Sequence, residues 1–129
     1  MDAPRLTLFS TPLVSSFVLD ETHRIFFDTG DGASALLEGK IHRAAMVALT
    51  HAHRDHIGGL PQLLNLRGAV AAAAGEPLKV VLPEGCGSVQ ALARFLSRFD
   101  PSSTGRVEWE SWSPGVEMAL PDGRFLRSY

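Results

Sequence analysis

Apolar and polar positions follow two rhythms along the chain, one typical of strands and one typical of helices. Strand-like segments are predicted at residues 5–9, 16–19, 24–27, 44–49, 78–82, 106–112, 115–120 and 124–126. Helical segments are predicted at residues 33–38, from about Gly59 onward, and from residue 88 to 99, with Ser88 as the N-cap. Because strands and helices alternate after an initial meander, the pattern predicts an α/β fold, a sandwich in which helices cover a sheet.

One strand-like segment, residues 44–49, leads directly into an unusual polar cluster. Its sequence, Ala-Ala-Met-Val-Ala-Leu, is typical of a strand that is buried on both faces. His51, His53, Asp55 and His56 follow immediately. If the chain turns after the strand, these side chains can converge on a point just beyond the strand end.

Imidazole nitrogen and carboxylate oxygen are ligands that zinc-type ions prefer, at about 2.0–2.2 Å. Four ligands from such close positions would crowd one small ion, so the spacing favours two neighbouring ions. His51 and His53 would hold one ion, and Asp55 and His56 the other. Zinc is the favoured metal, and manganese or iron are alternatives. A polar loop that contains histidines by chance is the alternative interpretation.

Other residues near the cluster also have predicted roles. Asp28 opens a glycine-rich turn after the strand at 24–27, where its carboxylate can accept hydrogen bonds from nearby backbone amides. Gly58 and Gly59 each disfavour a helix by about 1 kcal/mol relative to Ala. They therefore predict a close backbone approach, with the metal loop as the expected neighbour. His23 falls in a turn between two predicted strands, where we expect a solvated side chain.

Composition narrows the class of protein. The chain has 129 residues, of which 45% are hydrophobic and 20% charged, as in a single folded domain. A net charge of −2 gives no overall attraction to nucleic acid or to an acidic membrane, so an RNA substrate would need a local basic patch. The single Cys86 excludes an internal disulfide. Without a signal-peptide pattern or an apolar run of about 20 residues, we expect a cytoplasmic protein and no membrane partner.

The sequence of the polar cluster is also similar to the motif of a known protein family. Residues 51–56, His-Ala-His-Arg-Asp-His, resemble the H-x-H-x-D-H signature of the metallo-β-lactamase superfamily at every ligand position. Residues 57–64, Ile-Gly-Gly-Leu-Pro-Gln-Leu-Leu, look most like the ribonuclease Z branch. The resemblance implies the first αβ half of the αββα fold of this superfamily. Residues 1–129 are then expected to be the N-terminal portion of one such domain, incomplete at its C-terminus.

The resemblance implies a hydrolase that uses a metal-bound hydroxide, most like a ribonuclease Z-type phosphodiesterase or endoribonuclease with two zinc ions. Asp55 would then also be catalytic, because it would orient the attacking nucleophile. RNA or a small phosphodiester is the implied substrate. The superfamily carries a similar Asp-x-Gly behind the metal loop, so Asp28 would orient that loop without binding metal itself. The remaining ligands would come from a second half. We therefore expect the chain alone to be a poor hydrolase that needs a C-terminal half, or self-association, to cover an exposed sheet face.

Other functions stay open. A superfamily hydrolase that acts on a thioester or a lactone would use the same four ligands. A catalytically incomplete half-domain could bind metal or a partner without turnover. Residues 8–12 lack the glycine-containing loop that ribonuclease Z usually has after its first strand, which argues against transfer RNA processing in particular. His53 stands where oxygen-reducing di-iron members tend to carry glutamate, which argues against that branch.

Overall fold

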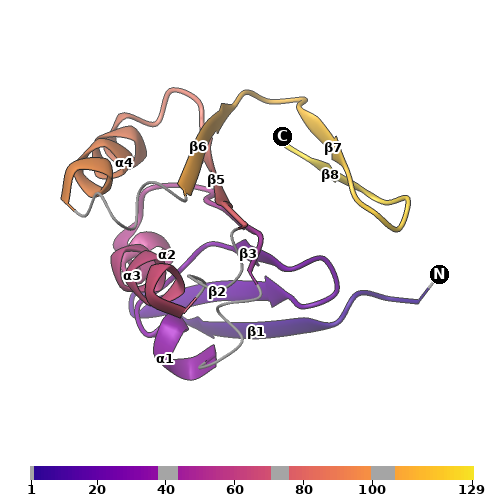
Figure 1. Ribbon diagram of the computed structural model, residues 1–129, viewed down its shortest axis with the longest axis horizontal. Helices are drawn as coiled ribbons and strands as arrows, with labels where there is room; N and C mark the ends of the chain where they lie inside the picture. Colours follow the sequence, from indigo (N-terminus) through magenta and orange to yellow (C-terminus); the bar gives the residue numbers. More distant parts are fainter. Residues whose placement is uncertain (1, 38–43, 71–75, 100–106) are drawn as a thin grey trace.

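A six-stranded mixed sheet forms the centre of the computed structural model, which describes residues 2–37, 44–70, 76–99 and 107–129 (Figure 1). Its strands lie side by side in chain order: β1 (Leu6–Thr11), β2 (Ser15–Asp20), β3 (Ile25–Phe27), β4 (Met46–Ala48), β5 (Leu78–Pro83) and β6 (Val107–Trp112). The first three strands pair antiparallel, and β3 to β6 pair in parallel. The predicted mixture of an initial meander and later strand–helix alternation is confirmed.

The helices are α1 (Ala33–Leu37), α2 (Arg54–Ile57), α3 (Leu60–Val70) and α4 (Gly87–Phe99). The short helix α2 was not predicted, because the polar cluster contains no apolar periodicity. The prediction of Ser88 as the N-cap of α4 was wrong. The Gln90 amide already bonds to the Cys86 carbonyl oxygen, so the helix begins before Ser88.

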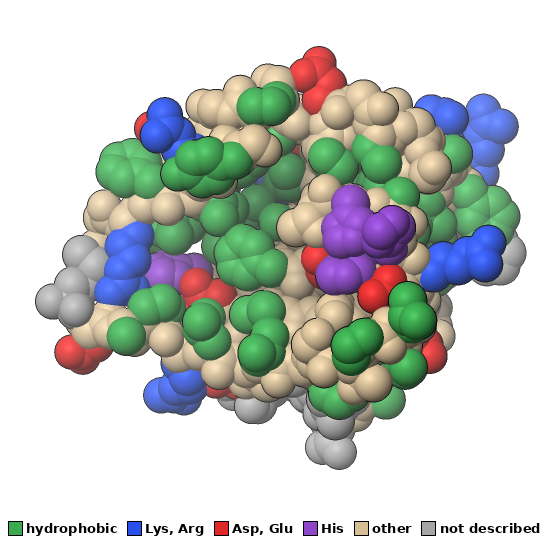
Figure 2. Space-filling model, turned by 180° about the vertical axis from the view of Figure 1, so that it is seen from behind, with side chains coloured by type: hydrophobic (Ala, Val, Ile, Leu, Met, Phe, Trp, Pro, Cys, Tyr) green, Lys and Arg blue, Asp and Glu red, His purple; other side chains and the backbone are tan. Residues whose placement is uncertain are grey.

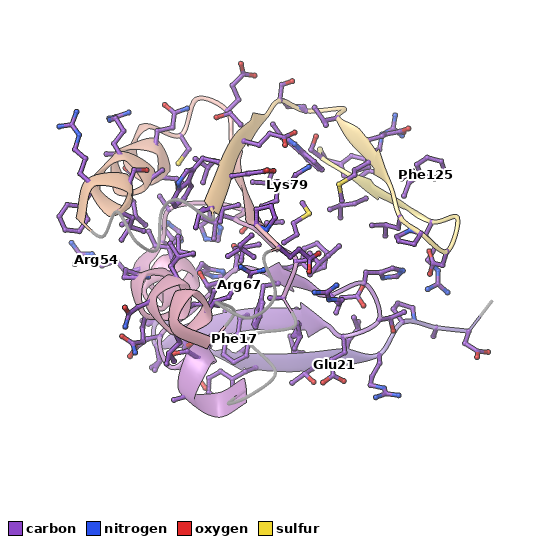
Figure 3. The ribbon with its side chains drawn as sticks, viewed as in Figure 1. Phe17, Glu21, Arg54, Arg67, Lys79 and Phe125 are labelled. Carbon is purple, nitrogen blue, oxygen red and sulfur yellow. The ribbon has the colours of Figure 1, made fainter. Side chains whose placement is uncertain are left out.

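Helices α1, α3 and α4 lie on one side of the sheet, and apolar side chains fill the space between them (Figure 1). The fully buried members of this core include Phe17, Phe26, Val47, Leu60, Leu63, Leu78, Val80 and Val89. Each such side chain contributes about 1.5–3 kcal/mol when it leaves water. Arg67 of α3 points into the same layer (Figure 3) and donates hydrogen bonds to the backbone carbonyls of Ala44 and Glu76. These bonds tie the helix to the segments that precede β4 and β5.

A two-stranded hairpin, β7 (Glu117–Ala119) and β8 (Phe125–Arg127), lies on the other side of the sheet (Figure 1). Its inward side chains, which include Met118 and Leu126, pack with Ile25, Met46, Val81 and Trp112. The expectation of an exposed sheet face is therefore only partly right. The hairpin covers the central strands, whereas Leu6 and Leu8 of β1 are 56% and 71% exposed.

Residue 38 of the helix predicted at 33–38 and residue 106 of the strand predicted at 106–112 fall outside the described residues, as do His42 and residues 71–75 and 100–105. Helix α3 itself continues through Val70. Within the described ranges, none of the helices is long and apolar enough to cross a membrane.

The expectation that His23 is solvated was wrong. Its side chain is only 4% exposed and lies between two carboxylates, with Nδ1 2.5 Å from Asp20 Oδ2 and Nε2 2.6 Å from Asp122 Oδ2. Asp20 ends β2, and Asp122 lies in the turn of the β7–β8 hairpin, so His23 joins the hairpin to the main sheet. Hydrogen bonds to Asp20 and then to Asp122 raise the pKa of His23 above its ordinary value, against the opposing effect of burial.

This clamp predicts a specific pH dependence of stability. Below about pH 6.5 His23 is protonated in both the folded and the unfolded chain, and its contribution is complete. As the pH rises through the raised pKa of the folded state, the charged imidazole is lost and the free energy of unfolding should fall. Urea denaturation across this range should show the decline in the wild type and not in His23→Gln. Asp122→Asn should make this decline in the free energy of unfolding smaller. A decline in His23→Gln as large as that of the wild type would contradict the assignment.

Candidate metal centre

The candidate site lies at the carboxyl ends of β3 and β4. These two strands are parallel neighbours, with Phe27 opposite Ala48, so the segments that follow them leave the sheet at the same edge. Asp28 directly follows β3, and Thr50 and His51 follow β4 after Leu49. The topology therefore brings together residues that lie far apart in the sequence.

Asp28 is the anchor of the site. Asp28 is buried. Its backbone has a positive φ of 61°, a conformation that Asp tolerates better than most residues. One carboxylate oxygen, Oδ1, accepts a 2.8 Å hydrogen bond from the Thr50 amide. The hydroxyl of Thr50 lies 3.0 Å from Oδ1 and 2.7 Å from Oδ2. The expectation that Asp28 accepts hydrogen bonds from the histidine loop is confirmed.

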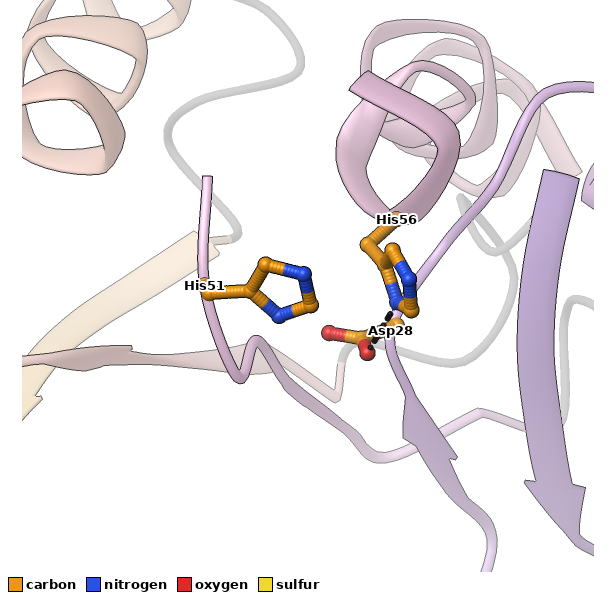
Figure 4. A group of neighbouring side chains, drawn as sticks. All are labelled: Asp28, His51 and His56. Atoms are coloured by element: carbon orange, nitrogen blue, oxygen red, sulfur yellow. Dashed lines mark hydrogen bonds and ion pairs between the residues drawn. The ribbon is translucent and has the colours of Figure 1, made fainter. Parts of the chain in front are cut away.

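The same carboxylate also contacts His56 of α2 (Figure 4). Nδ1 of His56 lies 2.8 Å from Asp28 Oδ2. Because a carboxylate only accepts hydrogen bonds, Nδ1 carries a proton, and in the neutral ring Nε2 keeps its lone pair. That Nε2 atom lies 3.4 Å from Asp55 Oδ2. Asp55 and His56 therefore present a ring nitrogen and a carboxylate oxygen side by side.

The three histidines of the cluster lie next to one another. The ring centroids of His51 and His53 are 4.5 Å apart, and those of His51 and His56 are 4.2 Å apart. Figure 2 shows histidine side chains gathered in one patch on the surface, with acidic side chains beside it. His51 thus lies beside both His53 and His56, and Asp55 lies beside His56. Of these four residues, only His51 and His56 belong to the group of close ligand atoms among the described residues, and Asp28 is its third member.

Tight backbone packing holds α2 against the turn that carries Asp28. The Thr29 amide donates to the His56 carbonyl at 2.7 Å, and the Gly59 amide donates to the Thr29 carbonyl at 2.9 Å. A Cβ atom on Gly59 would collide with the Gly30 carbonyl oxygen, and one on Gly30 would lie 2.5 Å from the Asp55 carbonyl oxygen. The predicted close approach of Gly59 is real, but its neighbour is the turn that carries Asp28 and not the histidine loop.

The donor set is suited to a metal ion. Ligand atoms of Asp28, His51 and His56 all lie within 4.8 Å of one another. Neutral imidazoles beside carboxylate oxygens match the preference of zinc-type ions. Asp28 is included in this group, yet the Thr50 amide, the Thr50 hydroxyl and His56 already donate hydrogen bonds to its two oxygens. Those bonds favour Asp28 as a residue that orients ligands.

Sequence reasoning missed the part that Thr50 takes in this site. Thr50 Oγ1 contacts the Asp28 carboxylate and also lies 2.7 Å from His51 Nδ1. The signal available in the sequence was its position between the buried strand and the first histidine. That position alone does not indicate which residue its hydroxyl would contact.

The chain is similar to known proteins. The metallo-beta-lactamase superfamily domain matches residues 12–120, which include all of the residues of the candidate site. Ribonuclease J from Corynebacterium glutamicum is 26% identical to the chain over 86 residues. That match covers 67% of this chain but only 12% of the length of the ribonuclease.

Replacement of Asp28 should weaken metal binding. Asp28→Ala removes the acceptor that orients His56 and the histidine loop, so the zinc affinity should fall by about 10–100-fold. Asp28→Asn tests the charge with less disturbance of the backbone, because Asn tolerates a positive φ. Calorimetric zinc titration would measure the affinity of both Asp28 variants. Asp31→Ala is the control, because Asp31 is an exposed residue of the same turn. An unchanged affinity would leave Asp28 as a turn residue only.

Gly59→Ala should destabilise the fold by about 1–3 kcal/mol, since the added methyl group meets backbone atoms that cannot move aside cheaply. Gly87→Ala is a matched control, because no atom lies within 4 Å of the position its Cβ would take. That control should change stability by less than about 0.5 kcal/mol. Equal free energies of unfolding for the two variants in denaturant titrations would refute this packing argument.

Proposed function

We propose that this chain, which belongs to the metallo-β-lactamase superfamily, provides the metal-binding motif of a metal-dependent hydrolase. The observation that carries the proposal is the convergence of His51, His56 and Asp28 at the edge of the sheet, where their ligand atoms lie within 4.8 Å of one another. His53 lies beside His51, and Asp55 lies beside His56, next to this group.

Each residue has a proposed task. His51 and His53 would hold one divalent ion, and Asp55 and His56 a second, while Asp28 keeps the loop in place. Zinc is the favoured metal. A bound divalent ion would polarise an oxygen of the substrate and lower the pKa of a bound water towards about 7. Asp55 can accept a hydrogen bond from that water and so direct it towards the substrate.

A phosphodiester, and RNA in particular, is the proposed substrate class. The similarity to ribonuclease J favours a nuclease among the hydrolases that this donor set could serve. The continuation of the motif at residues 57–64 resembles ribonuclease Z, so a ribonuclease of either kind is consistent with the sequence. A cytoplasmic location, where RNA is available, is part of the same proposal.

The chain is also proposed to be one portion of the active enzyme. A catalytic zinc normally has three protein ligands, and the motif offers two for each of two ions. A further segment or a second protein that covers the exposed Leu6 and Leu8 would complete both the fold and the metal ligands. A half-domain that binds metal or a partner without turnover is the alternative, and a thioester or lactone hydrolase is another.

The test is metal-dependent cleavage by the purified chain. With zinc or manganese we expect slow cleavage of bis(p-nitrophenyl) phosphate and of single-stranded RNA, and none of a thioester or a lactone. A chelator should abolish the cleavage, and zinc should restore it. His53→Ala and Asp55→Ala should lose it, whereas Asp31→Ala should keep it.

Cleavage that survives in His53→Ala and Asp55→Ala, or in the presence of the chelator, would contradict the proposal. Cleavage of the thioester or the lactone alone would replace the phosphodiester with that substrate class. Tight zinc binding without any cleavage would favour the half-domain alternative. Fast turnover by a monomer of this chain would show that no second portion is needed.

A further inference from the structure

We propose that Thr50 is a positioning residue of the metal centre: its hydroxyl group holds the imidazole of His51 in the Nδ1–H tautomer, so that Nε2 keeps the lone pair that a metal ion would need. This inference rests on the proposed function, because it takes His51 as a ligand. Thr50 lies just outside the His-x-His-x-Asp-His pattern, and only its contacts assign it this role.

The hydroxyl of Thr50 stands between two polar groups. On one side its oxygen lies 2.7 Å from Asp28 Oδ2 and 3.0 Å from Asp28 Oδ1. On the other side it lies 2.7 Å from Nδ1 of His51. All three distances are within the range of hydrogen bonds, so one hydroxyl group connects the buried carboxylate to the imidazole.

The number of available protons determines which group donates in each of these hydrogen bonds. A hydroxyl group has one proton to donate, and the carboxylate of Asp28 has none. The Thr50 proton therefore goes to Asp28, in a charge-assisted bond that is roughly twice as strong as a bond between neutral groups. The Thr50 oxygen can then only accept a hydrogen bond from His51, which places the proton of the neutral imidazole on Nδ1.

The Nε2–H tautomer of His51 would remove one hydrogen bond from this network. With its proton on Nε2, His51 would need the Thr50 proton at Nδ1, and the hydroxyl would no longer donate to Asp28. Asp28 would lose a hydrogen bond in a buried position. Nε2 would also carry a proton and could not bind a metal ion.

The Asp28 carboxylate consequently fixes the tautomer of both His51 and His56, in each case through a hydrogen bond network that ends at Nδ1. It contacts Nδ1 of His56 directly at 2.8 Å and reaches Nδ1 of His51 through the Thr50 hydroxyl. Figure 4 shows the two rings on either side of the Asp28 carboxylate. The backbone amide of Thr50 makes its own bond to Asp28, so removal of the hydroxyl leaves the loop attached.

The first test uses the unaltered, metal-free chain. Long-range ¹H–¹⁵N correlation spectra distinguish the two tautomers of neutral imidazole, and a His51→Gln variant assigns the signals of His51. At about pH 8.5, where an ordinary imidazole is neutral, we expect the proton of His51 on Nδ1. A predominant Nε2–H form would overturn the proposal.

The second test compares Thr50→Val, which keeps the shape of the side chain without the hydroxyl, with Thr50→Ser, which keeps the hydroxyl. We expect Thr50→Val to show a mixture of His51 tautomers and a zinc affinity lower by about 10-fold or more. Thr50→Ser should restore both towards the wild type. If Thr50→Val does not fold, the wild-type spectrum and the serine variant decide the question.

Wild-type zinc affinity in folded Thr50→Val, or equal losses in Thr50→Val and Thr50→Ser, would refute the role of the hydroxyl. Zinc titrations of His51→Ala and His56→Ala distinguish an error in the role of Thr50 from an error in the proposed function. If His51→Ala and His56→Ala bind zinc as the wild type does, the metal centre itself is wrong. If those variants lose zinc while Thr50→Val keeps it, only the role of Thr50 is refuted.

Discussion

The hydrogen bonds of one buried carboxylate hold the candidate site together. Asp28 accepts from the backbone and the hydroxyl of Thr50 and from the ring of His56, so it joins the ends of two strands to a short helix. Hydrogen bonds to a charged group contribute about 1.5–3 kcal/mol each. They also offset the strain of a non-glycine residue at positive φ, which costs on the order of 1–3 kcal/mol.

This arrangement depends on the parallel pairing of β3 with β4. Because both strands run in the same direction, Asp28 and Thr50 leave the sheet at one edge, although they are 22 positions apart. The absence of side chains at Gly30 and Gly59 then lets α2 pack directly on the Asp28 turn. Strand pairing, glycine packing and one carboxylate together fix where Asp55 and His56 stand. A rigid scaffold of this kind suits a metal site, since ligands that are already in position need little ordering on binding.

The sequence predicted the features that depend on neighbouring residues. The apolar run before His51 indicated a buried strand, and the turn at Asp28 indicated a carboxylate that accepts hydrogen bonds. Features that depend on distant partners could not be predicted in this way. His23 appeared to be a solvated turn residue because Asp122, which buries it, is 99 positions away. The role of Thr50 depends on Asp28 and His51 at once, and the helix α2 forms where tertiary packing outweighs a weak local preference.

The most direct test of the central claim is the anomalous diffraction of zinc in crystals of the chain grown with the metal. We expect an anomalous peak about 2.0–2.1 Å from Nε2 of His51 or Nε2 of His56, with the Nδ1 atoms of both rings still hydrogen-bonded to Thr50 and Asp28. Zinc bound only at other residues, or bound through the Nδ1 atoms of these two rings, would contradict it.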